Sequence, residues 1–242
     1  MHKGNSEAVF SIQHLTGQSP FTGNVLNQWF APQVENGYFF NAPTQDFVDA
    51  FEVTVDEVVD PRLEYTLARE GSTWINGEPY DPAWSPTGFT QKKHLQPLNE
   101  IPKGIKGDGD LNYTFMRYAE VLLMKAEALN ELNHGTEALD PLNQVRKRAR
   151  ESYLYDEALP GFGNIPDNLL PDITVTDQSQ LREIIRNERR VELGFEFHRF
   201  FDLMRYGKTY AEQRLSETSF NYDQHRYFPI PQNESDININ IN

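Results

Sequence analysis

Residues 181–207, LREIIRNERRVELGFEFHRFFDLMRYG, set a dense group of Arg and Glu side chains against aromatic and aliphatic residues. Side chains three and four positions apart are neighbours on a helix, so the spacing predicts pairs such as Arg189 with Glu192 and Arg199 with Asp202. The apolar positions cover too wide an arc for a one-sided surface helix, which predicts that the segment is largely buried. Because a buried charge without a partner costs several kcal/mol, we expect a paired internal network that needs no ligand. Its expected members are Glu188, Arg189, Glu192, Glu196, Arg199, Asp202 and Arg205.

A second helical pattern covers residues 114–150. Two apolar stripes at helical spacing are separated by the turn signal His134-Gly135, which predicts a helix-turn-helix hairpin of tetratricopeptide type. Pro141 lies within the second helix of this hairpin. That helix is therefore expected either to tolerate a kink or to begin late, with Asp140 as its cap.

The helical region as a whole is expected to span residues 113–242. Its later helices, over 178–206, have a start signal in Asp177, which Gln180 follows three residues later as in a capping box. A closing segment is expected at residues 227–234.

Residues 1–112 have a different character. They are rich in Gly, Pro, Asn and aromatic residues and show few sustained periods, which predicts loops with short strands. One short helix is expected near residues 44–51. The predicted fold class is therefore mainly α, with an irregular, loop-rich lobe that carries short strands.

All three tryptophans fall in this lobe, together with tyrosines and several Asn and Gln side chains. Flat rings beside amide groups suit the mixed apolar and hydroxylated face of a sugar, and loops often carry binding residues. The alternative is that the rings fill the core of a lobe that has little regular packing. The candidate ligand-binding residues are Trp29, Trp74, Trp84, Tyr38 and Tyr80.

Composition and motifs narrow the classes of function. The net charge of −14 argues against a nucleic-acid partner, because such binding depends on neutralising phosphates. The chain has no Cys, and its six His lie at no spacing typical of a metal site, so neither a metal nor a cofactor is expected. No catalytic residue can be assigned, since nucleophile-elbow, zinc-protease, Walker and dinucleotide-binding motifs are all missing from the sequence.

The pattern E-R-R-x-E-L-x-F-E-x-x-R-x-x-D-L-x-R, from Glu188 to Arg205, resembles the SusD/RagB family of bacterial outer-membrane nutrient-binding lipoproteins. Other segments carry the same resemblance in the same order. They are EAVFSIQ at 7–13, PTQDFVDAFE at 43–52, DPRLEYTL at 60–67, RYAEVLLMKAEALNEL at 117–132, LNQVRKRA at 142–149 and YFPIPQNE at 227–234.

The resemblance implies a non-enzymatic, surface-exposed lipoprotein of the outer membrane. Such proteins bind an oligosaccharide, a polysaccharide or another nutrient and deliver it to a SusC-like TonB-dependent transporter. The chain resembles only about the later half of a typical member, so the signal peptide and the lipidated Cys of the family are expected to lie outside it. A helical-repeat adaptor that binds protein is the alternative, and an enzyme acting on polysaccharide is the third possibility.

Overall fold

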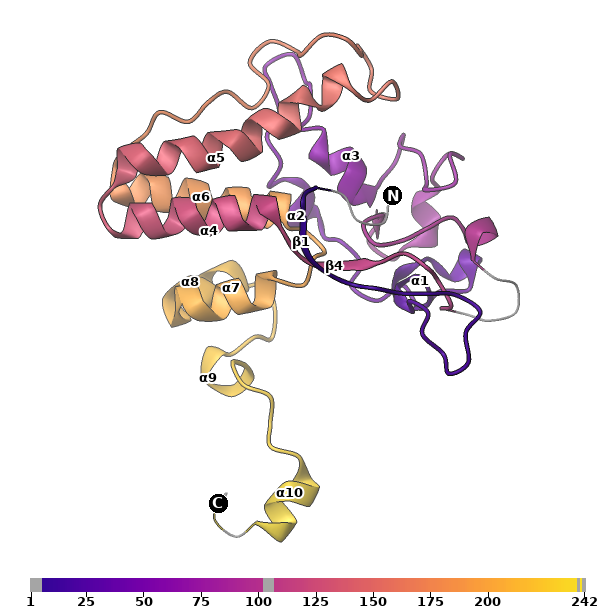
Figure 1. The fold of residues 1–242 in the computed structure, drawn as a ribbon. Coiled ribbons are helices and arrows are strands. Elements are labelled where there is room, and N and C mark those ends of the chain that lie inside the picture. Colours follow the sequence, from indigo (N-terminus) through magenta and orange to yellow (C-terminus); the bar gives the residue numbers. More distant parts are fainter. Residues whose placement is uncertain (1–5, 102–106, 239, 241–242) are drawn as a thin grey trace. The chain divides into compact units, whose positions relative to one another are not determined.

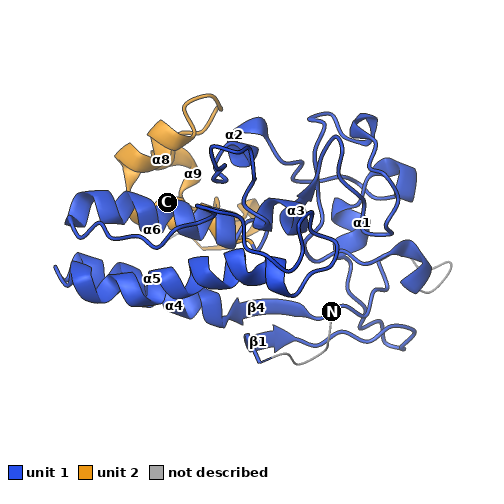
Figure 2. Ribbon diagram, turned by 90° about the horizontal axis from the view of Figure 1, so that it is seen from above, with its two compact units in different colours: residues 1–196 blue, residues 197–242 orange. Residues whose placement is uncertain are grey.

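The computed structural model describes residues 6–101, 107–238 and 240. It divides into two compact units, residues 1–196 and residues 197–242 (Figure 2). This division differs from the lobe boundary expected near residue 112. The reason is that strand β4 (Tyr113–Arg117) pairs antiparallel with strand β1 (Ala8–Ile12), which joins the loop-rich lobe to the helices within one unit.

Three helices form the regular part of the first unit. They are α4 (Tyr118–Glu131), α5 (Gly135–Arg150) and α6 (Gln178–Glu192), and α4 packs against both others (Figure 1). Their facing sides are apolar and fully buried, which confirms the helical hairpin expected from the two stripes. The shared core consists of Ala119, Leu122, Leu123, Ala126, Ala138, Leu142, Val145, Leu181, Ile185 and Leu193.

The sequence signals that predicted where these helices begin were confirmed for α6 and not for α5. The Asp177 carboxylate accepts a hydrogen bond from the Gln180 amide at 3.0 Å, which confirms the predicted start of α6. Helix α5 begins at Gly135 and runs through Pro141, so the late start is wrong. Residues 114–117, expected to begin the hairpin, form strand β4, because β1 supplies the pairing partner that favours an extended backbone for Tyr-Thr-Phe.

The loop-rich lobe contains short elements only, in keeping with its composition. The helix expected near residues 44–51 is present as α2, although it is only one turn long. The elements are α1 (Leu26–Phe30), η1 (Gln33–Glu35), α2 (Gln45–Val48), α3 (Arg62–Thr66), β2 (Leu67–Ala68), η2 (Pro82–Trp84), β3 (Thr90–Gln91) and η3 (Leu98–Glu100), with β2 and β3 paired. A further short helix, η4 (Glu151–Leu154), follows α5.

The lobe has two cores of its own. One lies behind α1 and gathers Phe30, Ala31, Ala68, Trp74, Tyr80 and Leu95. The other packs the α2–α3 region against α6 through Phe51, Leu63, Leu67 and Val191. Gly194 permits this second contact, because a Cβ there would lie only 2.4 Å from the Phe47 ring.

The described part of the second unit contains four helices. They are α7 (Arg199–Tyr206), α8 (Lys208–Arg214), α9 (Tyr222–His225) and α10 (Gln232–Ile237). Gly207, at φ +93°, makes the turn between the first two, a backbone conformation that favours glycine. Within the described ranges, no helix of either unit combines the length and the apolar character that crossing a bilayer requires.

Candidate functional site

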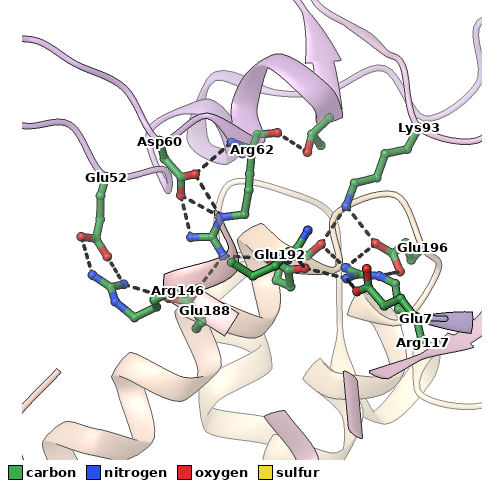
Figure 3. Close-up of polar contacts among 12 residues, drawn as sticks. Glu7, Glu52, Asp60, Arg62, Lys93, Arg117, Arg146, Glu188, Glu192 and Glu196 are labelled. Atoms are coloured by element: carbon green, nitrogen blue, oxygen red, sulfur yellow. Dashed lines mark hydrogen bonds and ion pairs between the residues drawn. The ribbon is translucent and has the colours of Figure 1, made fainter. Parts of the chain in front are cut away.

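The C-terminal part of α6 and the turn after it carry three buried carboxylates. Glu188 and Glu192 lie one helical turn apart, and Glu196 follows at the same spacing. Each is at most 4% exposed. Their partners are basic side chains that converge from the rest of the first unit, as Figure 3 shows.

Arg62, near the start of α3, is the central cation. Its guanidinium contacts the Asp60 carboxylate at 2.6 Å, Glu188 at 2.5 Å and Glu192 at 3.0 Å (Figure 3). Burial alone would lower the pKa of Arg62, but the three carboxylates outweigh it and hold that pKa well above its ordinary value. On the far side of Glu188, Arg146 of α5 lies 2.9 Å from the carboxylate and also pairs with Glu52.

Arg117, at the end of β4, joins the other two carboxylates. Its guanidinium contacts Glu192 at 2.6 Å and Glu196 at 2.8 Å, and it reaches Glu7 at 2.9 Å. The Lys93 ammonium donates to the Glu192 carbonyl at 2.7 Å and to the Glu196 carboxylate at 2.8 Å. Basic side chains from α3, the segment after β3, β4 and α5 therefore meet around the end of α6.

The electrostatics of the cluster show that the charges stabilise one another. Burial would raise the pKa of Glu196, but Lys93 and Arg117 outweigh it and lower that pKa to about 2. The pKa of Glu192 likewise lies well below its ordinary value, because Arg117 is the strongest of several cations that overcome the effect of burial. At Lys93, burial outweighs the neighbouring carboxylates, so the pKa of its ammonium lies below the ordinary value.

The network predicted from residues 181–207 thus has a different geometry from the one that helical spacing suggests. The described partners of Glu192 are Arg62, Arg117 and Arg148, all from other elements. Arg189 instead lies 3.6 Å from Glu120 of α4, and both side chains are buried. In the second unit, Arg205 pairs with Asp202 at 2.9 Å within α7, and Arg199 begins the same helix. No local signal identifies partners that lie 75 to 130 residues away.

Two of the five aromatic candidates lie inside the lobe core. Trp74 is 2% exposed and Tyr80 is 5% exposed. The Trp74 indole donates to the Glu35 carboxylate at 2.7 Å, and the Tyr80 hydroxyl lies 2.8 Å from the Thr90 hydroxyl. Trp84 is half-buried against both rings, with centroids 6.4 Å from Trp74 and 5.4 Å from Tyr80. The buried rings of Trp74 and Tyr80 therefore fill the core of the lobe, as the alternative interpretation expected.

The other two candidates lie at the surface, on two segments whose backbones are hydrogen bonded to each other. Trp29 is 44% exposed and Tyr38 is 46% exposed. The backbone of residues 38–40 runs along α1, because the Tyr38 amide donates to the Gln28 carbonyl and the Phe40 amide to the Trp29 carbonyl, both at 2.8 Å. Phe40, 55% exposed, is a third ring that the sequence reasoning missed, and no local pattern identifies it, because residues 38–40 form no strand.

We call Trp29, Tyr38 and Phe40 the aromatic patch. The Tyr38 and Phe40 rings have centroids 5.6 Å apart, and the Gln28 side-chain amide donates to the Tyr38 hydroxyl at 3.1 Å. Gly37 makes the close pairing possible, since a Cβ there would lie 2.0 Å from the Ala31 carbonyl oxygen. The patch therefore combines exposed rings with an amide on a backbone that is fixed by hydrogen bonds.

The charged cluster borders an open pocket of about 280 Å³. Within the described residues, no three His, Asp or Glu side chains are placed to hold a metal ion. The pocket is lined by Glu7, Arg62, Tyr65, Thr66, Lys92, Lys93, His94, Thr114, Arg117, Arg148, Glu192 and Glu196.

Comparison with known proteins gives consistent results. Residues 6–242 match the family model described as the SusD family. The chain is 39% identical over 127 residues to SusD-like protein P2 of Formosa agariphila, covering 51% of this chain and 23% of that protein. It is 42% identical over 99 residues to SusD-like protein P38 of the same organism, covering 41% of this chain and 18% of that protein.

Solved structures agree with these matches. A SusD-like carbohydrate binding protein from Bacteroides fragilis superposes with a TM-score of 0.66 at 27% identity, over 88% of this chain and 43% of that one. A SusD superfamily protein from Bacteroides vulgatus gives a TM-score of 0.70 at 23% identity, over 98% and 50%, and shows the shared fold alone. The chain thus spans about half the length of these solved structures, and the segments that match the curated relatives cover less than a quarter of each of them.

Proposed function

The chain belongs to the SusD family, and from that premise we propose that it contributes a glycan-binding surface to a protein of the bacterial outer membrane. The observation that carries the proposal is the aromatic patch. Three rings that are each 44% or more exposed lie on paired backbone, beside the side-chain amide of Gln28.

The chemistry of the aromatic patch favours contact with a sugar over contact with water. Exposed rings gain little from water, whereas the C–H face of a pyranose can stack on them and its hydroxyls can bond to amide and phenol groups. Trp29 and Tyr38 need little further ordering on binding, since the segments that carry them are already hydrogen bonded to each other. A binding surface that is ordered in advance loses less entropy when the ligand arrives.

The candidates inside the core have a supporting role in this proposal. Trp74 and Tyr80 pack behind Phe30, whose ring lies 6.2 Å from that of Trp29. They set the position of α1 and offer no exposed face to a ligand. Trp84, which is half-buried, stays a weaker candidate for contact with the glycan.

Membership of the family also supports a cellular setting. We place the protein at the cell surface as a lipoprotein that delivers its ligand to a SusC-like TonB-dependent transporter. Purification of the protein from native outer membranes tests this assignment. Recovery of such a transporter is expected, and repeated purification without one would contradict the proposed partner.

Calorimetric titration against a panel of neutral polysaccharides tests the patch. Replacing Trp29 by Ala should weaken binding about tenfold or more, equivalent to about 1.4 kcal/mol, without lowering the melting temperature. The matched control is Phe162→Ala, which removes a ring of similar exposure (43%) that lies outside the patch. Unchanged binding in the Trp29 variant, or equal losses in the two variants, would show that the patch is not the platform.

A further inference from the structure

The pocket beside the charged cluster is separate from the aromatic patch, because no residue of the patch lines it. Its walls come from α3, the segment after β3, strand β4, α5 and the end of α6, and several of its charged residues appear in Figure 3. At about 280 Å³ it lies at the lower end of the range for small-molecule sites. A pocket of this size has room for one sugar ring rather than for an extended chain.

The buried part of the cluster is electrically balanced without any ligand. Its eight charged side chains are each at most 20% exposed and pair among themselves. The four cations are Arg62, Lys93, Arg117 and Arg146, and the four carboxylates are Asp60, Glu188, Glu192 and Glu196.

Arg148 is an additional cation at the edge of this balanced set. Its side chain projects from α5, is 50% exposed, lines the pocket and contacts the Glu192 carboxylate. That carboxylate already accepts from Arg62 at 3.0 Å and from Arg117 at 2.6 Å. Among the described residues, Arg148 therefore shares a carboxylate that two buried guanidinium groups already neutralise.

The other charged side chains at the edge of the pocket are paired as well. Lys92 also lines the pocket, but its ammonium pairs with Glu64 at 2.5 Å. Glu7, the acidic group at the edge, is held by Arg117 at 2.9 Å. The lining counts five basic side chains against three acidic ones, in a chain whose net charge is −14. Cations therefore outnumber carboxylates among the side chains that line the pocket, while Asp60, Glu64 and Glu188 pair with the lining cations from outside it.

We propose that this pocket binds a uronate, an acidic sugar residue whose carboxylate pairs with the exposed edge of the Arg148 guanidinium. A planar guanidinium can hold a carboxylate through two parallel hydrogen bonds, and the partial exposure of Arg148 leaves donors available. Hydroxyl groups of the ring would face the polar side chains of Tyr65 and Thr114. The inference rests on the proposed glycan function for the class of ligand, and it adds a second subsite with its own specificity.

The test compares galacturonate with galactose by ligand-observed NMR titration of the chain at low and at moderate salt. We expect galacturonate to bind at least tenfold more tightly, and the preference to shrink as salt rises, because the pocket is open to solvent. Arg148→Gln should abolish the preference, and Arg148→Lys should retain part of it. The matched control is Lys147→Gln, which removes the same charge from the adjacent residue of α5, outside the pocket lining.

Three results would overturn the proposal. The first is equal binding of the two sugars, and the second is a preference that survives in Arg148→Gln. The third is binding of galactose 6-sulfate without binding of galacturonate, which would remove the carboxylate assignment. Trp29→Ala separates this subsite from the patch, since it should reduce binding of neutral polysaccharide and leave the preference for galacturonate unchanged.

Discussion

Replacing Glu196 by Gln tests whether the charged cluster stabilises the fold. The Glu196 carboxylate is bound by Lys93 at 2.8 Å and by Arg117 at 2.8 Å, and its side chain is only 5% exposed. Its pKa is lowered from 4.5 to about 2. At 1.36 kcal/mol per pKa unit, this shift corresponds to about 3 kcal/mol of folding free energy at neutral pH. Gln keeps the shape of the side chain but removes the charge, so the variant should lose about that amount.

The effect should depend on pH in a definite direction. Because the pKa of Glu196 is lower in the folded state, its contribution is complete above the unfolded value near 4.5 and is lost as pH falls towards about 2. The difference between parent and variant should shrink by about 1 kcal/mol at pH 4 and by about 2 kcal/mol at pH 3. Urea denaturation followed by circular dichroism at several pH values measures both free energies.

An exposed carboxylate provides the matched control. Glu131 pairs with Arg182 at 2.6 Å, but its side chain is 43% exposed, so Glu131→Gln should cost at most about 1 kcal/mol. Equal losses in the two variants would refute the argument from burial. A loss in Glu196→Gln that stays constant between pH 7 and pH 3 would refute the argument from the pKa.

Three further substitutions test local features of the fold by thermal or urea denaturation. Asp177→Ala should cost about 1 kcal/mol, because it removes the cap of α6, whereas Asp177→Asn should cost much less; equal costs would exclude capping as the cause. Gly194→Ala should cost about 1–3 kcal/mol through the clash with Phe47, and the companion change Phe47→Leu should recover part of that loss. Trp74→Phe should cost about 1–3 kcal/mol, because Glu35 loses the indole donor, and a fully stable variant would contradict this role.

The regular elements of this fold could be predicted because their causes are local. The hairpin follows from two apolar stripes, and the start of α6 follows from the capping hydrogen bond that the Gln180 amide donates to Asp177. The strand at residues 113–117 could not be predicted in the same way, since it depends on β1, about a hundred residues earlier. A short segment adopts the conformation that its distant partner stabilises.

Local sequence patterns predicted even less of the candidate sites than of the fold. Helical spacing identified Glu192 as part of a buried network, but it suggested Arg189 as the partner in place of Arg62 and Arg117. Residue type likewise identified the tryptophans without separating Trp29 at the surface from Trp74 in the core. Burial of a given ring depends on the packing of the whole lobe, which no pattern within a few residues records.

The charged cluster and the aromatic patch are linked by a short stretch of chain. Buried Asn27 of α1 exchanges two hydrogen bonds with the backbone of Gln96, at 2.8 Å and 3.1 Å. Three residues earlier, Lys93 is fixed to the end of α6 through Glu196. The helix that carries Trp29 is therefore attached through residues 93–96 to Glu196, a carboxylate that Arg117 of β4 also binds. Because a binding surface retains its geometry only when its supporting residues are fixed, the cluster can position the patch without contacting the glycan.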